Sequence, residues 1–236
     1  MCIRDSVHRV QSYNLFVSVG MIVGFDNDDP SIFDEQYEFL QAAQIPIVML
    51  SVLLAIPKTP LYKRLQEAGR LLTADPTGTD RSHYVGTAGG TNFHPMLMTR
   101  EELKEGQQAL YKRLYSPEAF ADRLLGNLSR FKEVNYQPER TKLENLGTAV
   151  RLARHYWKQG PKARKFFWSC IWRAFKQSPR LIAQMFVYMG MYLHFCQVHG
   201  KSIDWNPWQP QEDHTPKAPP PKAPAPKAPV REPVAV

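Results

Sequence analysis

Two apolar runs with a helical repeat between them dominate the first quarter of the chain. Residues 15–24 form a nearly unbroken run rich in β-branched side chains, and a second run contains a predicted strand at 48–55. Such runs are typical of strands in a parallel sheet that is covered on both faces. The sequence therefore predicts two parallel strands joined by a right-handed crossover. The crossover helix has apolar residues spaced by four, three and three positions, at Phe33, Tyr37, Leu40 and Ala43.

Turn residues mark where the first two predicted helices begin. Pro30 suits the first helical position, because its missing N–H is not needed there, and Asp29 can cap the first turn. Thr59 and Pro60 repeat this arrangement before the next helix. Residues 7–72 are therefore expected to form an α/β unit.

The remainder of the chain predicts a loop, a helical region and a tail. Residues 73–98 form the expected loop, and residues 99–200 carry helical spacing with breaks at 160–161 and 178–179. Residues 201–236 are rich in Pro, Ala and Lys. Such a composition cannot bury a core, so this segment is expected to be extended and disordered.

Composition narrows the class of protein. The chain has 236 residues, of which 43% are hydrophobic, and this is enough for a buried core. Its three cysteines, Cys2, Cys170 and Cys196, are far apart and odd in number. This usage is typical of a reducing compartment and argues against a disulfide framework or a zinc site. We therefore expect a cytoplasmic protein.

The net charge of +8 is concentrated in residues 140–201. This segment holds twelve Lys or Arg residues against one acidic residue, Glu144, together with many aromatic residues. Two interpretations stay open: the aromatic faces pack on the α/β unit, or the helices form a peripheral membrane or lipid-facing surface. The apolar part at 181–196 is shorter than a bilayer span, so a transmembrane helix is not expected. No recognisable motif indicates nucleic-acid binding.

Several stretches of the chain resemble one family of enzymes. They are Gly20-Met-Ile-Val-Gly-Phe-Asp-Asn-Asp28, residues 33–40, and Ile56-Pro-Lys-Thr-Pro-Leu-Tyr-Lys-Arg-Leu65. Here the chain resembles the last strands of a radical S-adenosylmethionine (SAM) barrel, in the branch that also binds cobalamin (B12). Residues 92–95, 102–106 and 114–118 resemble the helical C-terminal extension of that branch, which includes hopanoid-type lipid methylases. The resemblance covers residues 7–199 and implies a partial (β/α) barrel followed by an all-α extension.

The resemblance implies a specific chemistry. Members of the family hold a four-iron, four-sulfur (4Fe-4S) cluster on a Cys-x3-Cys-x2-Cys loop and cleave SAM to a deoxyadenosyl radical. Cobalamin, where present, delivers a methyl group. This sequence has no such cysteine triplet, so we assign it no catalytic residue and no metal ligand. We expect a C-terminal fragment that is inactive alone, with SAM, the cluster and cobalamin held completely only by the full-length protein. Residues 1–6 resemble a non-native leader.

The resemblance also implies where SAM approaches the chain. Active sites of parallel α/β folds lie at the carboxyl ends of the strands. The spacing Gly-x-Ile-x-Gly matches the family's fifth strand, where absent side chains let SAM approach the backbone, although Asn27 stands where the family often has Glu. The expected cofactor-binding residues are Gly20, Ile22, Gly24, Phe25, Asp26, Ala55 and Pro57.

Each of these features has an ordinary structural alternative. The glycines can relieve packing within a buried strand. The aspartates at 26, 28 and 29 form a metal or acid/base cluster, or one of them caps the following helix. Asn92 and Phe93 either gate the mouth of the barrel or only lead into a helix. His194 and His199 are five residues apart and fall on different helix faces, which argues against a shared metal.

The sequence supports two functions from different classes. The first is an enzyme: part of a cobalamin-dependent radical SAM methyltransferase, or of an enzyme for related C–H functionalisation, acting on a small-molecule or lipid substrate. The second is a non-catalytic module in which the basic aromatic helices bind a membrane or a protein partner. The basic segment at 140–201 suggests contact with the inner face of the cytoplasmic membrane in either case.

Overall fold

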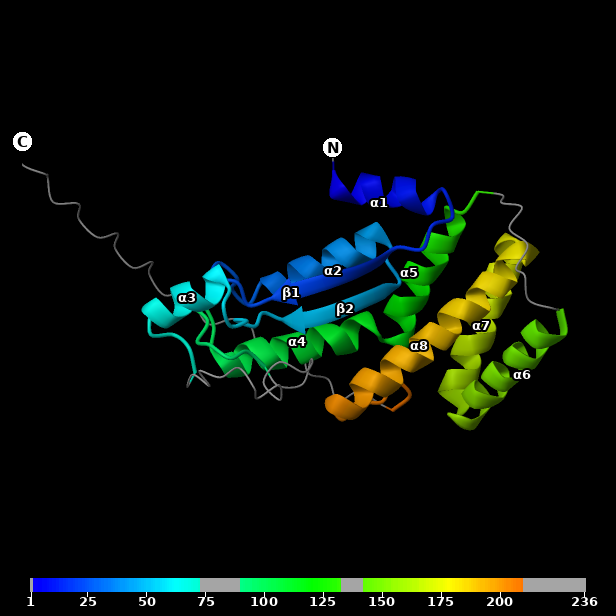
Figure 1. The fold of residues 1–236 in the computed structure, drawn as a ribbon. Coiled ribbons are helices and arrows are strands. Elements are labelled where there is room, and N and C mark those ends of the chain that lie inside the picture. The colour runs from blue at the N-terminus through cyan, green and yellow to red at the C-terminus, as the bar shows by residue number, and fades with distance from the viewer. Residues whose placement is uncertain (1, 73–89, 133–141, 210–236) are drawn as a thin grey trace, which may run out of the picture.

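The computed structural model describes residues 2–72, 90–132 and 142–209 and shows a mostly helical α/β fold (Figure 1). Within these ranges two strands and eight α-helices form. The strands are β1 (Ser18–Val23) and β2 (Ile47–Val52). The helices are α1 (Ile3–Gln11), α2 (Ile32–Ala43), α3 (Pro60–Glu67), α4 (Arg100–Leu114), α5 (Pro117–Ser129), α6 (Lys142–Lys158), α7 (Pro161–Gln177) and α8 (Ile182–Ser202), with a short 3₁₀ turn, η2 (Pro179–Leu181), before α8. The predicted tail from residue 210 lies outside the described residues.

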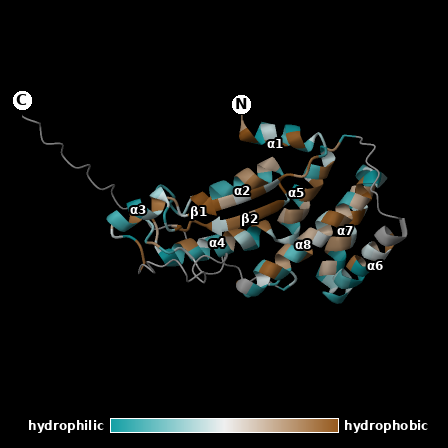
Figure 2. Cartoon of the chain, viewed as in Figure 1, coloured by the Kyte–Doolittle hydropathy of each residue, from teal (hydrophilic) through white to brown (hydrophobic). Residues whose placement is uncertain are grey.

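The strands β1 and β2 are parallel and are joined by α2, as predicted. One face of the sheet carries residues such as Val23, Val48 and Leu50, which are buried against the helices. The other face is open in this chain, because Gly20 and Ile22 are exposed. The expectation that both faces are covered is therefore wrong for this chain, although both strands are strongly hydrophobic (Figure 2).

Side chains of α4 close one edge of the sheet. The N–H of Leu53 donates to the Val23 carbonyl at 2.8 Å, so the backbone groups of Val48 and Leu50 point away from β1. The Tyr115 hydroxyl, at the end of α4, accepts from the Val48 N–H at 3.1 Å and donates to the Val48 carbonyl at 2.8 Å. The Gln107 amide donates to the Leu50 carbonyl at 3.3 Å. These side chains take the place of a neighbouring strand.

A buried arginine joins α5 to the α/β unit. Arg123 is 1% exposed. Its guanidinium donates to the Ile45 carbonyl at 2.9 Å, to the Leu114 carbonyl at 2.6 Å and to the Gln41 amide oxygen at 2.7 Å. Burial lowers the pKa of Arg123 to about 10. One side chain thereby connects α2, the segment leading into β2, the end of α4, and α5.

The helix α8 lies at the centre of the C-terminal helices. The stretch Pro179–Lys201 is long and apolar enough to cross a membrane by length and composition, which differs from the expectation based on residues 181–196 alone. In this fold, however, Tyr188 and Tyr192 of α8 are buried. Their hydroxyls donate to the Asn127 side-chain oxygen at 3.2 Å and to the Tyr115 carbonyl at 2.9 Å. One side of the helix is thus packed in the core, whereas only 33% of its apolar stretch is buried and Val187 and Val198 are exposed.

The ends of several predicted segments differ from the structure, since β1 spans only Ser18–Val23 and β2 ends at Val52 rather than at residue 55. The helix α2 begins at Ile32 rather than at Pro30, and the Asp29 carboxylate accepts from the Ser31 N–H at 2.8 Å in the turn before it. The unpredicted helix α1 crosses the proposed boundary between residues 6 and 7. Trp208, assigned to the tail, instead packs edge-on against Tyr156 with ring centroids 5.9 Å apart. The packed region therefore extends past residue 200.

Replacing Tyr115 by Phe is expected to destabilise the chain by about 1–3 kcal/mol. The substitution keeps the ring but leaves the N–H and carbonyl of Val48 without partners at a buried edge. The free energy of unfolding in urea measures the effect. Tyr13→Phe is the matched control, because Tyr13 is exposed, and its stability should stay within about 0.5 kcal/mol of the parent. Equal stability of the two variants would contradict the proposed edge closure.

Alkaline pH is also expected to destabilise the fold. Burial raises the pKa of Cys170, Cys196 and Tyr188 to about 12, whereas ordinary thiols and phenols ionise near 9.0 and 10.0. Between these values only the unfolded chain releases the proton, so the stabilisation present at neutral pH is lost as the pH rises, by about 1.4 kcal/mol per pH unit per group. Arg123 acts in the opposite direction, since its pKa is lowered. Burial also raises the pKa of four further groups, Tyr111, Tyr115, Tyr156 and Tyr192.

Urea unfolding at about pH 8 and about pH 11 tests this balance. The midpoint should fall strongly at the higher pH, and much of the tyrosinate absorbance should appear together with unfolding rather than before it. Full tyrosine ionisation while the far-UV circular dichroism stays folded would show that these hydroxyls are accessible, contrary to their burial.

Candidate functional site

The candidate site lies at the carboxyl ends of β1 and β2. Because the strands are parallel, the turn after Val23 and the segment after Val52 come out at the same edge of the sheet. The segments around Arg70 and Asn92 also reach this edge, since the Leu72 N–H donates to the Asn92 carbonyl at 3.0 Å. Four chain segments therefore meet where the sequence predicted a cofactor site.

Asp28 orders the turn that follows β1. One of its carboxylate oxygens accepts from the N–H of Gly24 at 2.8 Å and from the N–H of Phe25 at 3.0 Å. The carboxylate thus binds the turn behind it, rather than capping α2. Within the described ranges no group of three His, Cys, Asp or Glu residues could hold a metal ion. The metal-cluster interpretation of the three aspartates has no support in this part of the chain.

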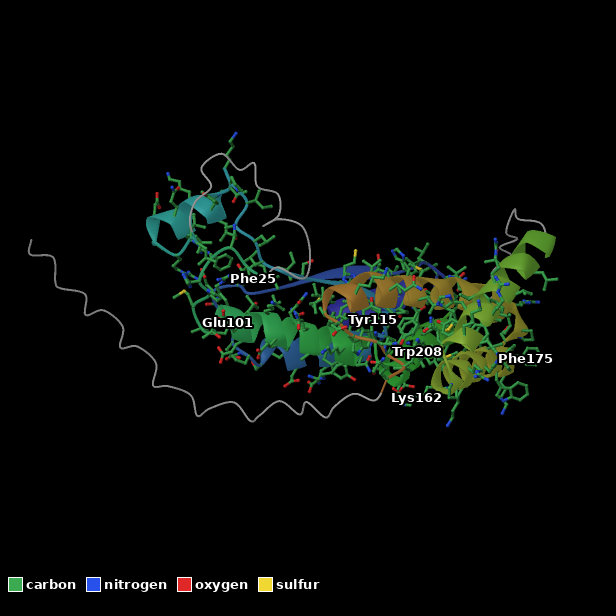
Figure 3. All side chains as sticks on the ribbon, turned by 90° about the horizontal axis from the view of Figure 1, so that it is seen from below. Phe25, Glu101, Tyr115, Lys162, Phe175 and Trp208 are labelled. Carbon is green, nitrogen blue, oxygen red and sulfur yellow. The ribbon has the colours of Figure 1, made fainter. Side chains whose placement is uncertain are left out.

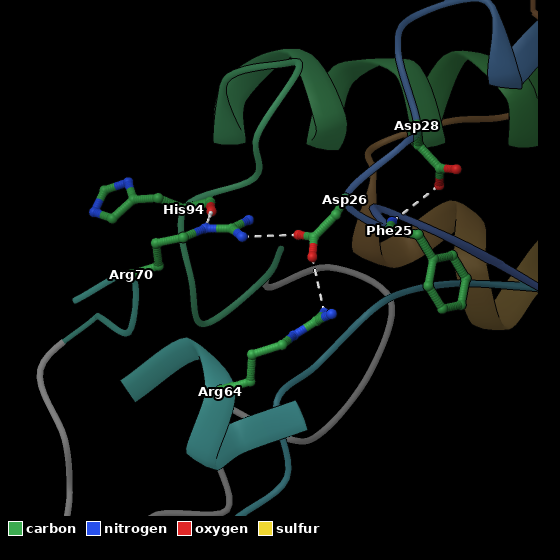
Figure 4. A network of polar contacts seen from close by, with 6 residues as sticks. All are labelled: Phe25, Asp26, Asp28, Arg64, Arg70 and His94. Atoms are coloured by element: carbon green, nitrogen blue, oxygen red, sulfur yellow. Dashed lines mark hydrogen bonds and ion pairs between the residues drawn. The ribbon is translucent and has the colours of Figure 1, made fainter. Parts of the chain in front are cut away.

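Asp26 connects the end of β1 to α3 and to the segment after it (Figure 4). Its two carboxylate oxygens pair with Arg64 and with Arg70, each at an N–O distance of 2.8 Å. Arg70 also donates through Nε to the carbonyl of His94 at 2.9 Å. Both oxygens of this predicted site residue are therefore engaged with arginines of the same chain.

Asn92 holds the end of β2. Its side-chain oxygen accepts from the Ala55 N–H at 2.8 Å, and its side-chain amide donates to the Ala55 carbonyl at 2.9 Å. The Thr91 hydroxyl donates to the Leu53 carbonyl at 2.8 Å. Asn92 therefore bonds to the backbone of Ala55 in the way that a residue of a neighbouring strand would.

The two glycines of the motif have different structural reasons. Gly24 has a φ of +104°, and a Cβ built there would lie 2.9 Å from Cδ2 of Leu103, so both conformation and packing call for glycine. Gly20 lies in β1 on the open face of the sheet, and a Cβ built there meets nothing within 4 Å. The packing interpretation explains Gly24 within this chain and does not explain Gly20.

The remaining predicted residues divide between the open face and the interior. Ile22, Phe25 and Met49 are 45%, 49% and 49% exposed, and Met49 is the partner of Gly20 in the strand register. Ala55 is buried in a small cluster with Leu65 and Phe93, so its side chain faces α3 rather than the open face. Pro57 is half-buried in the segment after it.

The residues of the described chain do not fit an iron–sulfur cluster. Such a cluster needs thiolate ligands. Cys170 and Cys196 are buried within the helices, and burial raises their pKa values to about 12, which favours the neutral thiol. Cys2 is exposed near the start of α1. SAM is a different case, because Gly20 and Ile22 present an accessible apolar strand face that is able to form one wall of a site.

The arginines of this site were not predicted from the sequence. Arg64 and Arg70 bind a carboxylate 38 and 44 residues earlier in the chain, and no local spacing indicates such a pair. Asn92 was recognised as notable, but its bonds to Ala55 depend on how the segment after residue 89 returns to β2. The available signal was a carboxylate at the end of one strand and arginines on and after α3, the helix that follows the parallel partner strand.

Replacing Asp26 by Asn is expected to loosen α3 and the segment 69–72. Both arginines then lose a charged partner, and Arg70 is largely covered at this site. Backbone amides of residues 60–72 should exchange with deuterium roughly tenfold faster, corresponding to about 1.4 kcal/mol. Asp34→Asn is the control, because it removes the exposed pair with Arg113, and surface pairs contribute about 0–1 kcal/mol. Unchanged exchange in Asp26→Asn would show that the pairs do not hold α3.

Three methyltransferases are similar to this chain. Hopanoid C-2 methylase of Rhodopseudomonas palustris is 40% identical over 73 residues, which are 31% of this chain and 14% of that protein. An uncharacterized methyltransferase of Synechocystis is 27% identical over 197 residues, covering 82% of this chain and 35% of that protein. Bacteriochlorophyllide d C-12(1)-methyltransferase of Chlorobaculum tepidum is 25% identical over 120 residues, covering 51% and 24%. The chain thus spans at most about a third of these relatives.

No solved structure matches the chain. The domain of unknown function DUF4070 matches residues 59–204, from the cap of α3 to the turn after α8. This region includes α4, which closes the sheet, and Arg64 and Arg70, which bind the end of β1. The match covers more than half of the chain, and the chain therefore belongs to the DUF4070 family.

Proposed function

We propose that this chain is the C-terminal part of a radical SAM methyltransferase of the cobalamin-dependent type. The observation that carries the proposal is the similarity to a methyltransferase over 82% of the chain, together with local similarity to two further methyltransferases. The Gly-x-Ile-x-Gly strand and its parallel partner support it, because they place an accessible strand face beside the carboxyl edge of the sheet.

In this proposal the chain supplies part of the SAM site and no redox centre. Gly20 and Ile22 would lie against SAM, and the ordered turn from Gly24 to Asp28 would fix the end of their strand. Asp26 would act as a positioning residue through its two arginines. The iron–sulfur cluster and cobalamin would be held by other segments of the complete protein, since the described residues do not fit the cluster.

A hydrophobic substrate agrees with the open face of the sheet. Ile22 and Met49 on the strands and Phe25 in the turn after β1 present exposed apolar side chains. One relative is named as a hopanoid C-2 methylase and another as a bacteriochlorophyllide d methyltransferase. We therefore propose a lipid or another largely apolar small molecule as the substrate.

A second candidate function is a non-catalytic binding module. Exposed aromatic side chains beside Lys and Arg on α6 and α7 favour it, because ordinary surface helices present polar side chains. The two candidates differ in what the complete protein must contain: the enzyme needs three cluster cysteines, and the binding module does not.

The genomic DNA upstream of the Val7 codon tests the proposal first. We expect an in-frame extension that encodes Cys-x3-Cys-x2-Cys, preceded by a cobalamin-type domain. The complete protein, purified anaerobically, should then contain about four iron atoms per chain and form 5′-deoxyadenosine from SAM on reduction. A reading frame without the cysteine triplet, or an iron-loaded protein that leaves SAM intact, would refute the enzyme assignment.

Gly20→Val in the complete protein is expected to weaken SAM binding roughly tenfold or more, because the added side chain would fill the accessible strand face. The fold should tolerate it, since nothing lies within 4 Å of the added Cβ. Gly24→Leu is a poorer probe, because the φ of +104° and Leu103 oppose any side chain there.

Titration calorimetry with SAM measures the effect, and Gly147→Val is the matched control. Gly147 lies on α6, and a Cβ there also meets nothing within 4 Å. The control should bind SAM like the parent protein. If Gly20→Val does so as well, Gly20 is not part of the SAM site.

A further inference from the structure

The helix α7 has two apolar faces, of which only one is covered. The inner face packs into the core through Ala163, Phe166, Phe167, Cys170 and Ala174. On the opposite side Trp168, Trp172 and Phe175 are 52%, 57% and 48% exposed. Their spacing of four and three residues places them in one row along the helix. A surface helix normally presents polar side chains in this position.

Cations surround this aromatic row. The helix α7 contains Lys162, Arg164, Lys165, Arg173 and Lys176 and no acidic residue. The Lys176 ammonium lies 5.2 Å from the centre of the Trp172 ring, and Trp172 stacks on Phe175 with ring centroids 6.1 Å apart. We call the set Arg164, Lys165, Trp168, Trp172, Phe175 and Lys176 the α7 outer face.

The neighbouring helix extends the same pattern. Trp157, near the end of α6, is 56% exposed, and the Arg164 guanidinium lies 4.6 Å from the centre of its ring. Figure 3 shows Phe175 at the far end of the molecule from Phe25 and Glu101. The aromatic and cationic surface is therefore remote from the carboxyl edge of the sheet and serves no role in the SAM site proposed above.

We propose that the α7 outer face docks on the surface of a membrane that contains anionic lipids. The Trp and Phe rings would enter the boundary between headgroups and acyl chains, and the flanking Lys and Arg would contact the lipid phosphates. Charge complementarity supports this occupant, because residues 140–201 hold twelve Lys or Arg against Glu144. This proposal is independent of the enzymatic one.

The geometry favours a bilayer over a nucleic acid. Binding of single strands needs a groove that follows the backbone, with bases stacked on rings along it. The three rings of the α7 outer face instead stand in a single row on the exposed side of one helix. A row of this kind meets a flat interface with all its side chains at once. The contact through the α7 outer face would be peripheral, because its rings lie in one row along one side of a helix.

Vesicle flotation of the full chain tests the proposal. The protein should float with vesicles of phosphatidylcholine and phosphatidylglycerol and not with phosphatidylcholine alone, and added salt should weaken the binding. Tryptophan emission should shift to shorter wavelength on binding, because Trp168 and Trp172 would leave water.

Two variants test which residues carry the contact. The triple change Trp168→Ser, Trp172→Ser and Phe175→Ser removes the rings, and the double change Lys165→Glu and Lys176→Glu reverses two charges; each should lower the partition coefficient roughly tenfold or more. The double change Met96→Ser and Leu97→Ser, which removes exposed apolar side chains near α4, is the control and should bind normally. Circular dichroism checks that each variant is folded.

Three outcomes would overturn the proposal. The first is no flotation with anionic vesicles. The second is flotation that folded variants of the α7 outer face leave unchanged. The third is tight, salt-sensitive binding of a single-stranded oligonucleotide by a chain that does not bind the vesicles. That result would assign the surface to a nucleic acid.

Discussion

The guanidinium of Arg123 holds the two parts of this fold together. It lies in the interior with three neutral oxygen acceptors, from the α2–β2 connection, from Gln41 and from the last turn of α4. The carbonyl end of a helix carries partial negative charge, so the Leu114 carbonyl offsets part of the cost of burying the cation. Because each acceptor comes from a different element, the positions of α2, α4 and α5 are set together. The closed edge of β2 depends on that arrangement, and so does the turn after β1, where Gly24 lies against Leu103 of α4.

The helical region of the family and the two strands are structurally dependent on each other. Leu103 of α4 occupies the space that a side chain at Gly24 would need. Arg64 and Arg70 form ion pairs with Asp26. The DUF4070 region therefore shapes the end of β1, although β1 lies outside the matched residues. This dependence explains why a turn with an unusual backbone conformation can be kept at the edge of a sheet of only two strands.

Local patterns in the sequence were enough to predict both strands, the crossover helix α2, the start of α3, and a helical region from residue 99 with breaks before α7 and α8. Apolar spacing reports which face of an element is buried, and this held for α2, where Phe33, Leu40 and Ala43 are buried. It could not show that Gly20 and Ile22 are exposed to solvent. A hydrophobic strand that is uncovered on one face has the same apolar pattern as a strand that is covered on both faces. Asp26 pairs with Arg64 and Arg70, and Asn92 bonds to Ala55. These contacts join segments that are distant in the sequence, so they depend on the path of the folded chain and not on local spacing. The start of α2 was misplaced because the turn at Asp29 and Pro30 uses capping residues before the helix begins.

Closure of the β2 edge by Tyr115 and Gln107 has a consequence for the behaviour of the protein in a crowded cell. An unpaired strand edge is a template on which another molecule can add a strand, and chains of such additions produce aggregates. Here the outward N–H and carbonyl of Val48 are already bonded to one hydroxyl, and the Leu50 carbonyl is bonded to an amide. A foreign strand would have to displace a helix to pair with β2. The helix that follows the sheet thus also protects it from self-association at that edge.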